Sequence, residues 1–337
     1  MRKIFIFTVL LLILVALVYI YTAPRLSTQA ESSKKLLGTT VDLKIYGQGA
    51  KLAERDVIKS IEKTQDLIDG HKQRSEISLI NNMAGIASVA VSPTTFNVVK
   101  RSLALSKATG GNFDISIGPL ADLWKAAIKT NTLPETAAVK KAIRLTDYRM
   151  IDMDFRLETI KLPSTGMKLD VGAVGKGYAF DLANKILEKH KIKSALLSCG
   201  SSIVAIGKNP QGKPWKIAVS HPRKTEKENF LGYVELEDQA LSTTGDYEQF
   251  SVINGKRFSH IIDPVSGYPA EGVQAVTVIA KNGTDADAYS TAIFVMGVKK
   301  GLYFLNSQSG VEGLIVDQDG KVHKSKNFKL IEAEEET

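Results

Sequence analysis

The hydrophobic and polar positions along the chain follow two spacings, one typical of strands and one typical of helices. Residues 40–46 alternate as in a half-buried strand, and residues 53–68 repeat their apolar side chains at a roughly helical interval. Further strands are expected over 194–197, 215–219, 231–236 and 273–280, and further helices over 93–109, 177–190 and 284–294. This irregular mixture predicts an α+β (mixed α/β) architecture rather than a regular parallel array.

The N-terminus departs from this pattern with a long apolar run. Arg2 and Lys3 precede an almost unbroken apolar stretch from Ile4 to Tyr21, close to the ~20 residues that cross a bilayer. A cleaved signal peptide usually has a shorter apolar region of about 7–15 residues, although residues 27–30 offer small side chains for cleavage. We therefore expect residues 1–24 to be a retained signal anchor, a single-pass transmembrane helix. Because the positive residues stay in the cytoplasm, the globular part would lie outside it, on the periplasmic or extracellular face of the cell membrane.

The composition of the remaining chain predicts its boundaries. Residues 25–35 are polar and rich in Ser, Thr, Gln and Lys, which indicates a spacer between the anchor and the folded part. Residues 36–331 then form one globular domain, and residues 332–337 form an acidic, solvated tail.

Cysteine content and net charge narrow the class of protein. The only cysteine, Cys199, excludes an internal disulfide framework and an N-terminal lipid-modified cysteine, so any anchoring must come from the apolar run. The formal net charge is +8, but the lysines are scattered and no aromatic–basic module accompanies them. We therefore expect no nucleic-acid partner and assign the basic surface to a nearby anionic membrane.

A glycine-rich segment from Leu169 to Asp181 is the richest candidate for ligand binding. A strand is expected to end in its glycines and a helix to begin there, so that backbone N–H groups could face a phosphate. The segment is no P-loop, because Lys176 is followed by glycine, and no dinucleotide fingerprint, because the position three residues after Gly177 is neither glycine nor alanine. A tight turn explains the glycines equally well. The flanking charges of Asp170 and Lys176 favour a site for a flavin ring and a phosphate.

A second candidate segment begins the helix expected at residue 284. Asp287 and Thr291 are four positions apart and so share one helix face, where a carboxylate and a hydroxyl suit Mg²⁺. Asp285 is off that face and is expected to cap the helix, together with or in place of Thr284. For Asp287, capping and metal binding both remain open.

A third candidate is a strand expected to enter a Pro–Gly turn around His260. A histidine can act as a general base at neutral pH, although a lone histidine is more often structural. Asp263 would either orient the imidazole or fix the turn before Pro264. The preceding residues 242–247 are equally consistent with a site and with a plain loop.

Taken in order, these segments resemble the ApbE family of FAD:protein FMN transferases, from about Leu36 to about Leu305. The matching motifs are Leu37-Gly38-Thr39, residues 75–81, Phe113-Asp114 with Gly118-Pro119-Leu120 and Trp124, residues 170–181, residues 260–267 and residues 286–292. Each motif is weak alone, but the ordered set is specific.

The resemblance implies a fold, a reaction and a set of site residues. The fold would be a single unit with FAD in a cleft between two lobes, and His260, aided by Asp263, would be the catalytic base. The Ala173 carbonyl, Asp287 and Thr291 would hold Mg²⁺. The residues expected to contact FAD are Leu37, His71, Phe113, Asp114, Ile115, Asp170, Lys176 and Ile262.

Two of these positions depart from the family pattern. Leu37 replaces a methionine, and His71 stands where an aromatic side chain that stacks on the flavin is common. The implied reaction is Mg²⁺-dependent transfer of the FMN moiety of FAD to a threonine hydroxyl of an acceptor protein, with release of AMP. The expected acceptor carries a Thr or Ser site and is a membrane-associated redox subunit. The alternatives are a Mg²⁺-dependent FAD pyrophosphatase and a membrane-tethered flavin-binding protein without catalysis.

Overall fold

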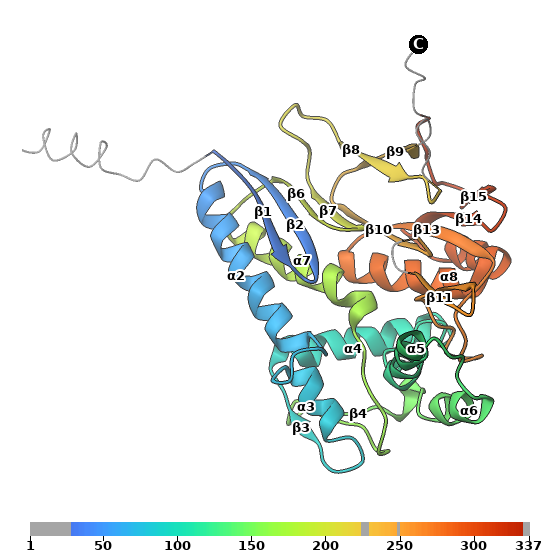
Figure 1. The fold of residues 1–337 in the computed structure, drawn as a ribbon. Coiled ribbons are helices and arrows are strands. Elements are labelled where there is room, and N and C mark those ends of the chain that lie inside the picture. The colour runs from blue at the N-terminus through green and yellow to red at the C-terminus, as the bar shows by residue number, and fades with distance from the viewer. Residues whose placement is uncertain (1–27, 224–228, 248–249, 333–337) are drawn as a thin grey trace, which may run out of the picture.

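A computed structural model describes residues 28–223, 229–247 and 250–332, and an eight-stranded antiparallel sheet forms its centre (Figure 1). The strand order is β1-β2-β6-β7-β10-β13-β14-β15. These strands are β1 Gln29–Leu36, β2 Thr39–Tyr46, β6 Ser194–Cys199, β7 Ser202–Ile206, β10 Gln239–Gly245, β13 Val273–Ala280, β14 Glu312–Asp317 and β15 Val322–Lys324. The sheet combines strands from both ends of the chain, so one unit is built from the whole described length.

Each face of the sheet is covered by a different layer. Helices α2 (Ala50–Ile68), α7 (Gly172–Lys189) and α8 (Gly283–Ser307) pack on one face, and the hairpin β8 (Trp215–Ser220) with β9 (Phe230–Leu236) packs on the other (Figure 1). Strand β13 is buried along its whole length because its side chains alternate between the two cores.

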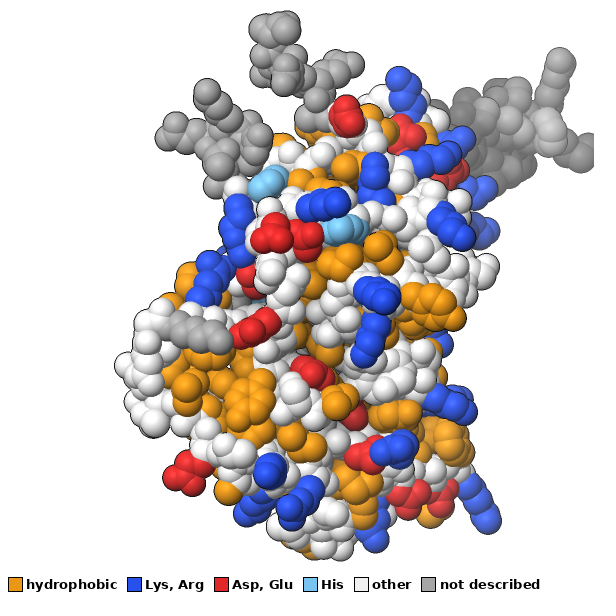
Figure 2. All heavy atoms as spheres, turned by 90° about the vertical axis from the view of Figure 1, so that its right-hand side faces the viewer, with side chains coloured by type: hydrophobic (Ala, Val, Ile, Leu, Met, Phe, Trp, Pro, Cys, Tyr) orange, Lys and Arg blue, Asp and Glu red, His pale blue; other side chains and the backbone are white. Residues whose placement is uncertain are grey.

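The remaining elements lie beyond α7 and α8, at the lower end of Figure 1. They comprise α3 Glu76–Asn82, α4 Pro93–Ala108, α5 Gly118–Thr130, α6 Thr136–Arg144, a 3₁₀ turn η1 Tyr148–Met150 and a small sheet of β3 Val89–Ala90, β4 Asp152–Asp154 and β5 Thr159–Lys161. A two-stranded ribbon, β11 Phe250–Ile253 and β12 Lys256–Ser259, lies beside α5. On the face drawn in Figure 2, Lys and Arg side chains lie scattered among acidic and hydrophobic ones.

The mixed α/β architecture expected from the sequence is confirmed, and the expected strand over 273–280 coincides with β13. The spacer prediction for residues 25–35 is wrong from Gln29 onward, because residues 29–36 form β1 and pair with β2. Only Ala30 in β1 is buried. A polar edge strand lacks the apolar alternation that reveals a half-buried strand, and its lysines protect the open edge from other chains.

The predicted anchor, residues 1–24, lies outside the described residues, as do residues 333–337 of the predicted acidic tail. Within the described ranges, no helix is long and apolar enough to span a membrane.

The first turn of α8 is joined to the middle of α7. The Asp181 carboxylate of α7 accepts hydrogen bonds from the N–H groups of Gly283 (2.7 Å) and Thr284 (3.0 Å), at the first turn of α8. In return, Asp287 of α8 accepts a hydrogen bond from Gly177 N–H in α7 (2.7 Å). Burial raises the pKa of Asp181. The two helices therefore hold each other through charged groups close to the predicted metal site.

Asn282 is the N-cap of α8, which corrects the expectation that Thr284 or Asp285 is. The Asn282 side chain accepts a hydrogen bond from Asp285 N–H (2.9 Å) and donates one to the Asp285 carboxylate (2.9 Å), a reciprocal arrangement like a capping box. Asp285 also pairs with Arg101 of α4. Asp285 is thus a hydrogen-bond partner of the N-cap residue and not the N-cap itself. Its ion pair with Arg101 joins α8 to α4.

The helix crossing predicts a large stability loss for Gly177→Ala. A Cβ at Gly177 would lie 2.1 Å from the Gly283 carbonyl oxygen, and that backbone cannot move aside as a side chain can. We expect the free energy of unfolding to fall by about 3 kcal/mol. Thermal unfolding measures this, with Gly175→Ala in the same helix as the matched control, since its Cβ would meet only Ile68 Cδ1 at 3.5 Å. Equal melting temperatures for the two variants would contradict the close crossing.

Candidate functional site

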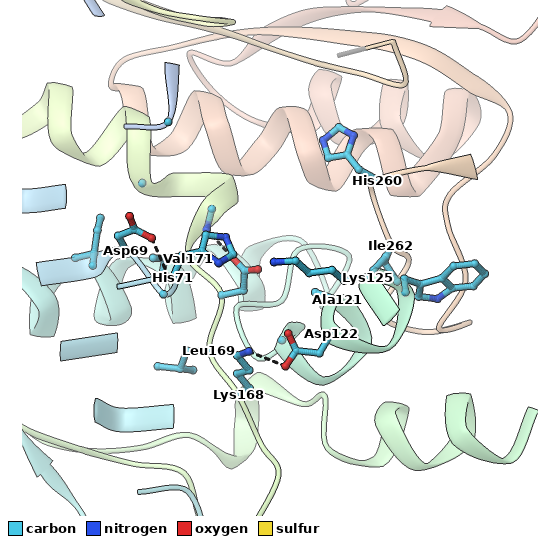
Figure 3. Close-up of a pocket in the computed structure, with 18 of the residues that line it drawn as sticks. Asp69, His71, Ala121, Asp122, Lys125, Lys168, Leu169, Val171, His260 and Ile262 are labelled. Carbon is cyan, nitrogen blue, oxygen red and sulfur yellow. Dashed lines mark hydrogen bonds and ion pairs between the residues drawn. The ribbon is translucent and has the colours of Figure 1, made fainter. Parts of the chain in front are cut away.

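Two adjoining cavities lie between the first residues of α7, helix α5, the end of α2 and the chain that leaves β12. Their volumes are about 580 Å³ and about 370 Å³, each in the range that holds cofactor-sized ligands. The residues that line both are His71, Ala121, Asp170, Gly172, Lys176, His260 and Ile262. Figure 3 shows His71 and His260 on opposite sides of the larger cavity.

The structure brings most of the predicted site residues to these two cavities. Leu37 lines the larger one, and Phe113, Asp114, Ala173, Asp287 and Thr291 line the smaller one. Ile115 and Asp263 are absent from both linings.

Asp170 is held at the shared wall by backbone hydrogen bonds. Its N–H donates to the Ile115 carbonyl (2.8 Å), and its carboxylate accepts from Gly172 N–H (2.8 Å) at the start of α7. Ile115 is fully buried, so its connection to the site is through its carbonyl. The strand predicted before the glycines is not formed, because residues 169–171 belong to no strand and Lys168 before them makes an isolated bridge with Ile117. Asp170 and Lys176 nevertheless lie together, as expected.

Asp287 is a buried carboxylate that both helices and the sheet hold in place. It is 4% exposed and accepts hydrogen bonds from Gly177 N–H and from the Ser202 hydroxyl of β7, each 2.7 Å long. The Gly177 N–H is also the ordinary helical partner of the Ala173 carbonyl. Because this N–H also donates to Asp287, its hydrogen bond to the Ala173 carbonyl is weakened. Ala173 lines the same cavity as Asp287.

The Thr291 hydroxyl lies one helical turn after Asp287, 3.4 Å from the Thr244 hydroxyl of β10. The described residues contain no group of three or more His, Cys, Asp or Glu side chains that could hold a metal. The donor set at this wall is instead one carboxylate, one backbone carbonyl and one hydroxyl. All three are hard oxygen donors, which fit Mg²⁺ bound with waters and substrate phosphate oxygens.

His260 directly follows β12, rather than standing within a strand as expected, and lines both cavities. Asp263 makes hydrogen bonds within the turn that follows His260. Its carboxylate accepts hydrogen bonds from the N–H groups of Val265 (2.9 Å) and Ser266 (3.3 Å), which fixes the turn that follows. Of the two roles left open for Asp263, these contacts support the structural one.

The turn after Asp263 is also fastened to α5. The Trp124 indole N–H donates to the Gly267 carbonyl (2.8 Å), and Trp124 packs against Phe258 and Tyr268. The two chain segments on either side of His260 are therefore anchored to the same tryptophan, which holds this wall of the cavity in position.

Leu37 occupies a two-residue turn between β1 and β2. Leu37 (φ 52°) and Gly38 (φ 74°) both have positive φ, as in a type I′ hairpin turn. Glycine or asparagine is usual at the first of these positions, so leucine there carries strain. The Leu37 N–H donates to the Gln65 side chain of α2 (2.5 Å), which fixes the turn over the cavity.

Phe113 and Asp114 are buried, and both carboxylate oxygens of Asp114 accept hydrogen bonds from the protein. One carboxylate oxygen accepts from the Ser116 N–H (2.8 Å) and hydroxyl (2.7 Å), and the other accepts from Tyr148 N–H (2.9 Å). Burial raises the pKa of Asp114. These contacts support a role in shaping the cavity wall rather than in direct binding.

Sequence reasoning missed one part of the site and left another open. Lys125 of α5 lines the larger cavity and extends into it in Figure 3, and nearby Lys168 pairs with Asp122 (2.6 Å). The only signal for Lys125 was its place directly after Trp124. The part left open between a site and a plain loop is residues 242–247, of which 242–244 lie in β10 and line the smaller cavity. Three hydroxyl residues before a glycine look like a loop, although here they lie in the middle of a sheet.

Comparisons with known proteins find a matching family and named relatives. The sequence model of the ApbE family matches residues 37–315. A "FAD:protein FMN transferase" from Klebsiella pneumoniae is 30% identical, over 88% of this chain and 92% of its own, and one from Treponema pallidum is 29% identical, over 86% and 85%.

Solved structures of the family have the same fold. The ApbE protein of Thermotoga maritima superposes with a TM-score of 0.82 at 31% identity, covering 91% of this chain and 100% of its own. The "Flavin Transferase ApbE from Vibrio cholerae" has a TM-score of 0.78 at 27% identity, covering 89% and 98%. Because the family model spans most of the chain and the relatives align along nearly their full lengths, this chain belongs to the ApbE family.

Proposed function

We propose that this chain transfers the FMN moiety of FAD to a threonine hydroxyl of an acceptor protein, with Mg²⁺ as the metal. FMN transfer from FAD to a protein is the reaction for which its relatives are named. The observation that carries the proposal is the shared wall of the two cavities. There Asp170, Lys176 and His260 stand between a large cavity and a smaller one that contains Asp287 and Thr291.

The reaction exchanges the phosphoanhydride bond of FAD for a phosphodiester bond to threonine. The threonine oxygen forms a bond to the FMN-side phosphorus, the bond from that phosphorus to the bridging oxygen breaks, and AMP leaves with that oxygen. His260 accepts the hydroxyl proton. Lys125 and Lys176 offer positive charge to the pyrophosphate from two sides, so positioning and charge neutralisation provide most of the catalysis.

Mg²⁺ would be held by the Ala173 carbonyl, the Asp287 carboxylate and the Thr291 hydroxyl, and would neutralise charge on the pyrophosphate oxygens. Hydrogen bonds from Gly177 and Ser202 hold the Asp287 carboxylate, which fixes the orientation of this metal ligand.

Two other functions use the same site. A FAD pyrophosphatase would replace the threonine with water and release FMN and AMP, and a flavin-binding protein would leave FAD intact. The second is the weaker alternative, since binding alone needs neither a base nor a metal donor set.

Incubation of the soluble part with FAD, Mg²⁺ and a candidate acceptor protein tests these functions. We expect flavin fluorescence on the acceptor after a denaturing gel, together with AMP. Free FMN with AMP and no labelled acceptor would identify a hydrolase, and unchanged FAD would identify a binding protein.

Membrane tethering through residues 1–24, with the globular part outside the cytoplasm, is part of the same proposal. It rests on the charged residues before the apolar run. The expected acceptor is then a membrane-associated redox subunit on the same side. Recovery of the mature protein free of membranes, starting near Glu31, would contradict the anchor.

A further inference from the structure

The ribbon of β11 and β12 has two faces with different surroundings. Ser251 pairs with Phe258, and both line the larger cavity. By the alternation of strands, Phe250, Val252 and Arg257 belong to the opposite face. Phe250 and Val252 are 50% and 52% exposed. We call Phe250, Val252 and Arg257 the ribbon patch.

The ribbon patch is an ordered surface. The Arg257 guanidinium lies over the Phe250 ring, 3.9 Å from its centroid, and the same guanidinium donates to the Asp246 carbonyl (3.0 Å). The guanidinium is therefore held by a hydrogen bond and by its contact with the ring, and it packs over one face of the Phe250 ring. Aromatic and arginine side chains held in this way lose little entropy on binding and are the usual anchors of protein interfaces.

A third cavity of about 310 Å³ adjoins the ribbon patch. Its wall includes Arg257, Arg223 and Asp246, and Arg223 donates two hydrogen bonds to the Asp246 carboxylate (2.7 and 2.6 Å). Phe258 and Ser259 line this cavity and also the larger one. The end of β12 therefore separates the third cavity from the larger one, and His260 is the residue that follows β12.

We propose that the acceptor protein docks on the ribbon patch and the third cavity, an inference that rests on the proposed function. The transferred group must pass to a hydroxyl carried by another folded protein, so part of that protein has to stand beside His260. A segment that crosses Ser259 from the ribbon patch reaches the catalytic wall. The ribbon patch exposes apolar and aromatic side chains, whereas the third cavity beside it is lined by charged ones. The matching acceptor surface therefore presents apolar side chains to the patch and polar side chains to the cavity, around its threonine-bearing loop.

The test uses Phe250→Ala and Val252→Asp, with a soluble acceptor domain that the wild-type enzyme flavinylates as the probe. Phe155→Ala is the matched control for the first variant, because Phe155 is 63% exposed and has Lys100 Nζ 5.3 Å from its ring centroid, in the lower part of the molecule. Leu157→Asp, at a residue 64% exposed, is the control for the second. We expect the ribbon variants to raise the KM for the acceptor about 10- to 30-fold and to leave FAD affinity and melting temperature unchanged. The controls should match the wild type.

A short peptide that contains the acceptor's threonine adds a second measurement. It lacks the folded surface, so the wild type and Phe250→Ala should label it equally. Equal KM values of ribbon and control variants on the folded domain would overturn the inference. So would wild-type self-association that Phe250→Ala abolishes without change in transfer, since the patch would then serve a second copy of the chain. If the wild type labels no acceptor but releases FMN, the proposed function fails, and this inference fails with it.

Discussion

Asp287→Ala should lower FAD cleavage by about 10³-fold or more, because it removes the one carboxylate of the metal donor set. A bound metal contributes several kcal/mol to stabilising charge in phosphoryl transfer, and each 1.36 kcal/mol corresponds to about tenfold in rate. Single-turnover release of AMP from FAD across a Mg²⁺ titration measures the effect. A readout without catalysis is the rise in melting temperature with Mg²⁺, which the variant should lose.

Asp287→Ala also lowers the stability of the fold, and controls must separate this effect from the loss of the metal ligand. Asp287 accepts hydrogen bonds from Gly177 N–H and the Ser202 hydroxyl, and removing it leaves both donors buried without this acceptor, at about 1–3 kcal/mol. Ser202→Ala loses one of these contacts but keeps the carboxylate, so it should retain most activity. Asp285→Ala, two residues earlier on α8, should retain it as well.

If Asp287→Ala kept normal Mg²⁺-dependent cleavage, the carboxylate would only join α7 to α8, and the metal assignment would be wrong. Loss of activity with an unchanged response of melting temperature to Mg²⁺ would point the same way. The joint loss of activity and of the Mg²⁺ response, in a folded variant, is what the assignment requires.

The sequence predicted the central elements well where the pattern was strong. The strand over 273–280 was found at its observed bounds because every one of its residues is buried, which leaves a mainly apolar run broken only by Gln274 and Thr277. The element α8 continues past the predicted end at residue 294, but as two helical pieces that meet at a kink at Gly297, whose φ of 72° and ψ of −178° are not helical. Local patterns do not show whether two helical pieces continue each other.

The candidate site was predicted to a useful extent through short motifs that lie far apart in the sequence. Asp170 and Asp287 reach one place only because α7 and α8 cross at Gly177 and Gly283, a contact between backbones that no periodicity reveals. Lys125 was not predicted, because its position also depends on segments that are distant in the sequence. An exposed helical lysine has no local signal for binding, and its role depends on the cavity that other segments build around it.

His260→Ala should keep FAD binding and lose about 10²–10⁴-fold in the rate of transfer, the usual contribution of a general base. The residue stands on the wall between the two cavities, and the turn after it is held by Trp124 and Asp263, so the substitution should leave that wall intact. His71→Ala is the matched control, because His71 lines the same two cavities from the opposite side (Figure 3). We expect the control to weaken FAD binding with little change in the rate at saturating FAD, which separates binding from catalysis.

The pH dependence of transfer decides whether His260 moves the proton. A histidine base is active in its neutral form, so the wild-type rate should rise with pH through an ionisation near neutrality. In His260→Ala that ionisation should disappear from the profile, while in His71→Ala it should remain. Tight FAD binding, near-normal turnover and an unchanged profile in His260→Ala would remove this histidine from the mechanism. The proton would then pass to a carboxylate at the same wall, and Asp170 is the one that lines both cavities.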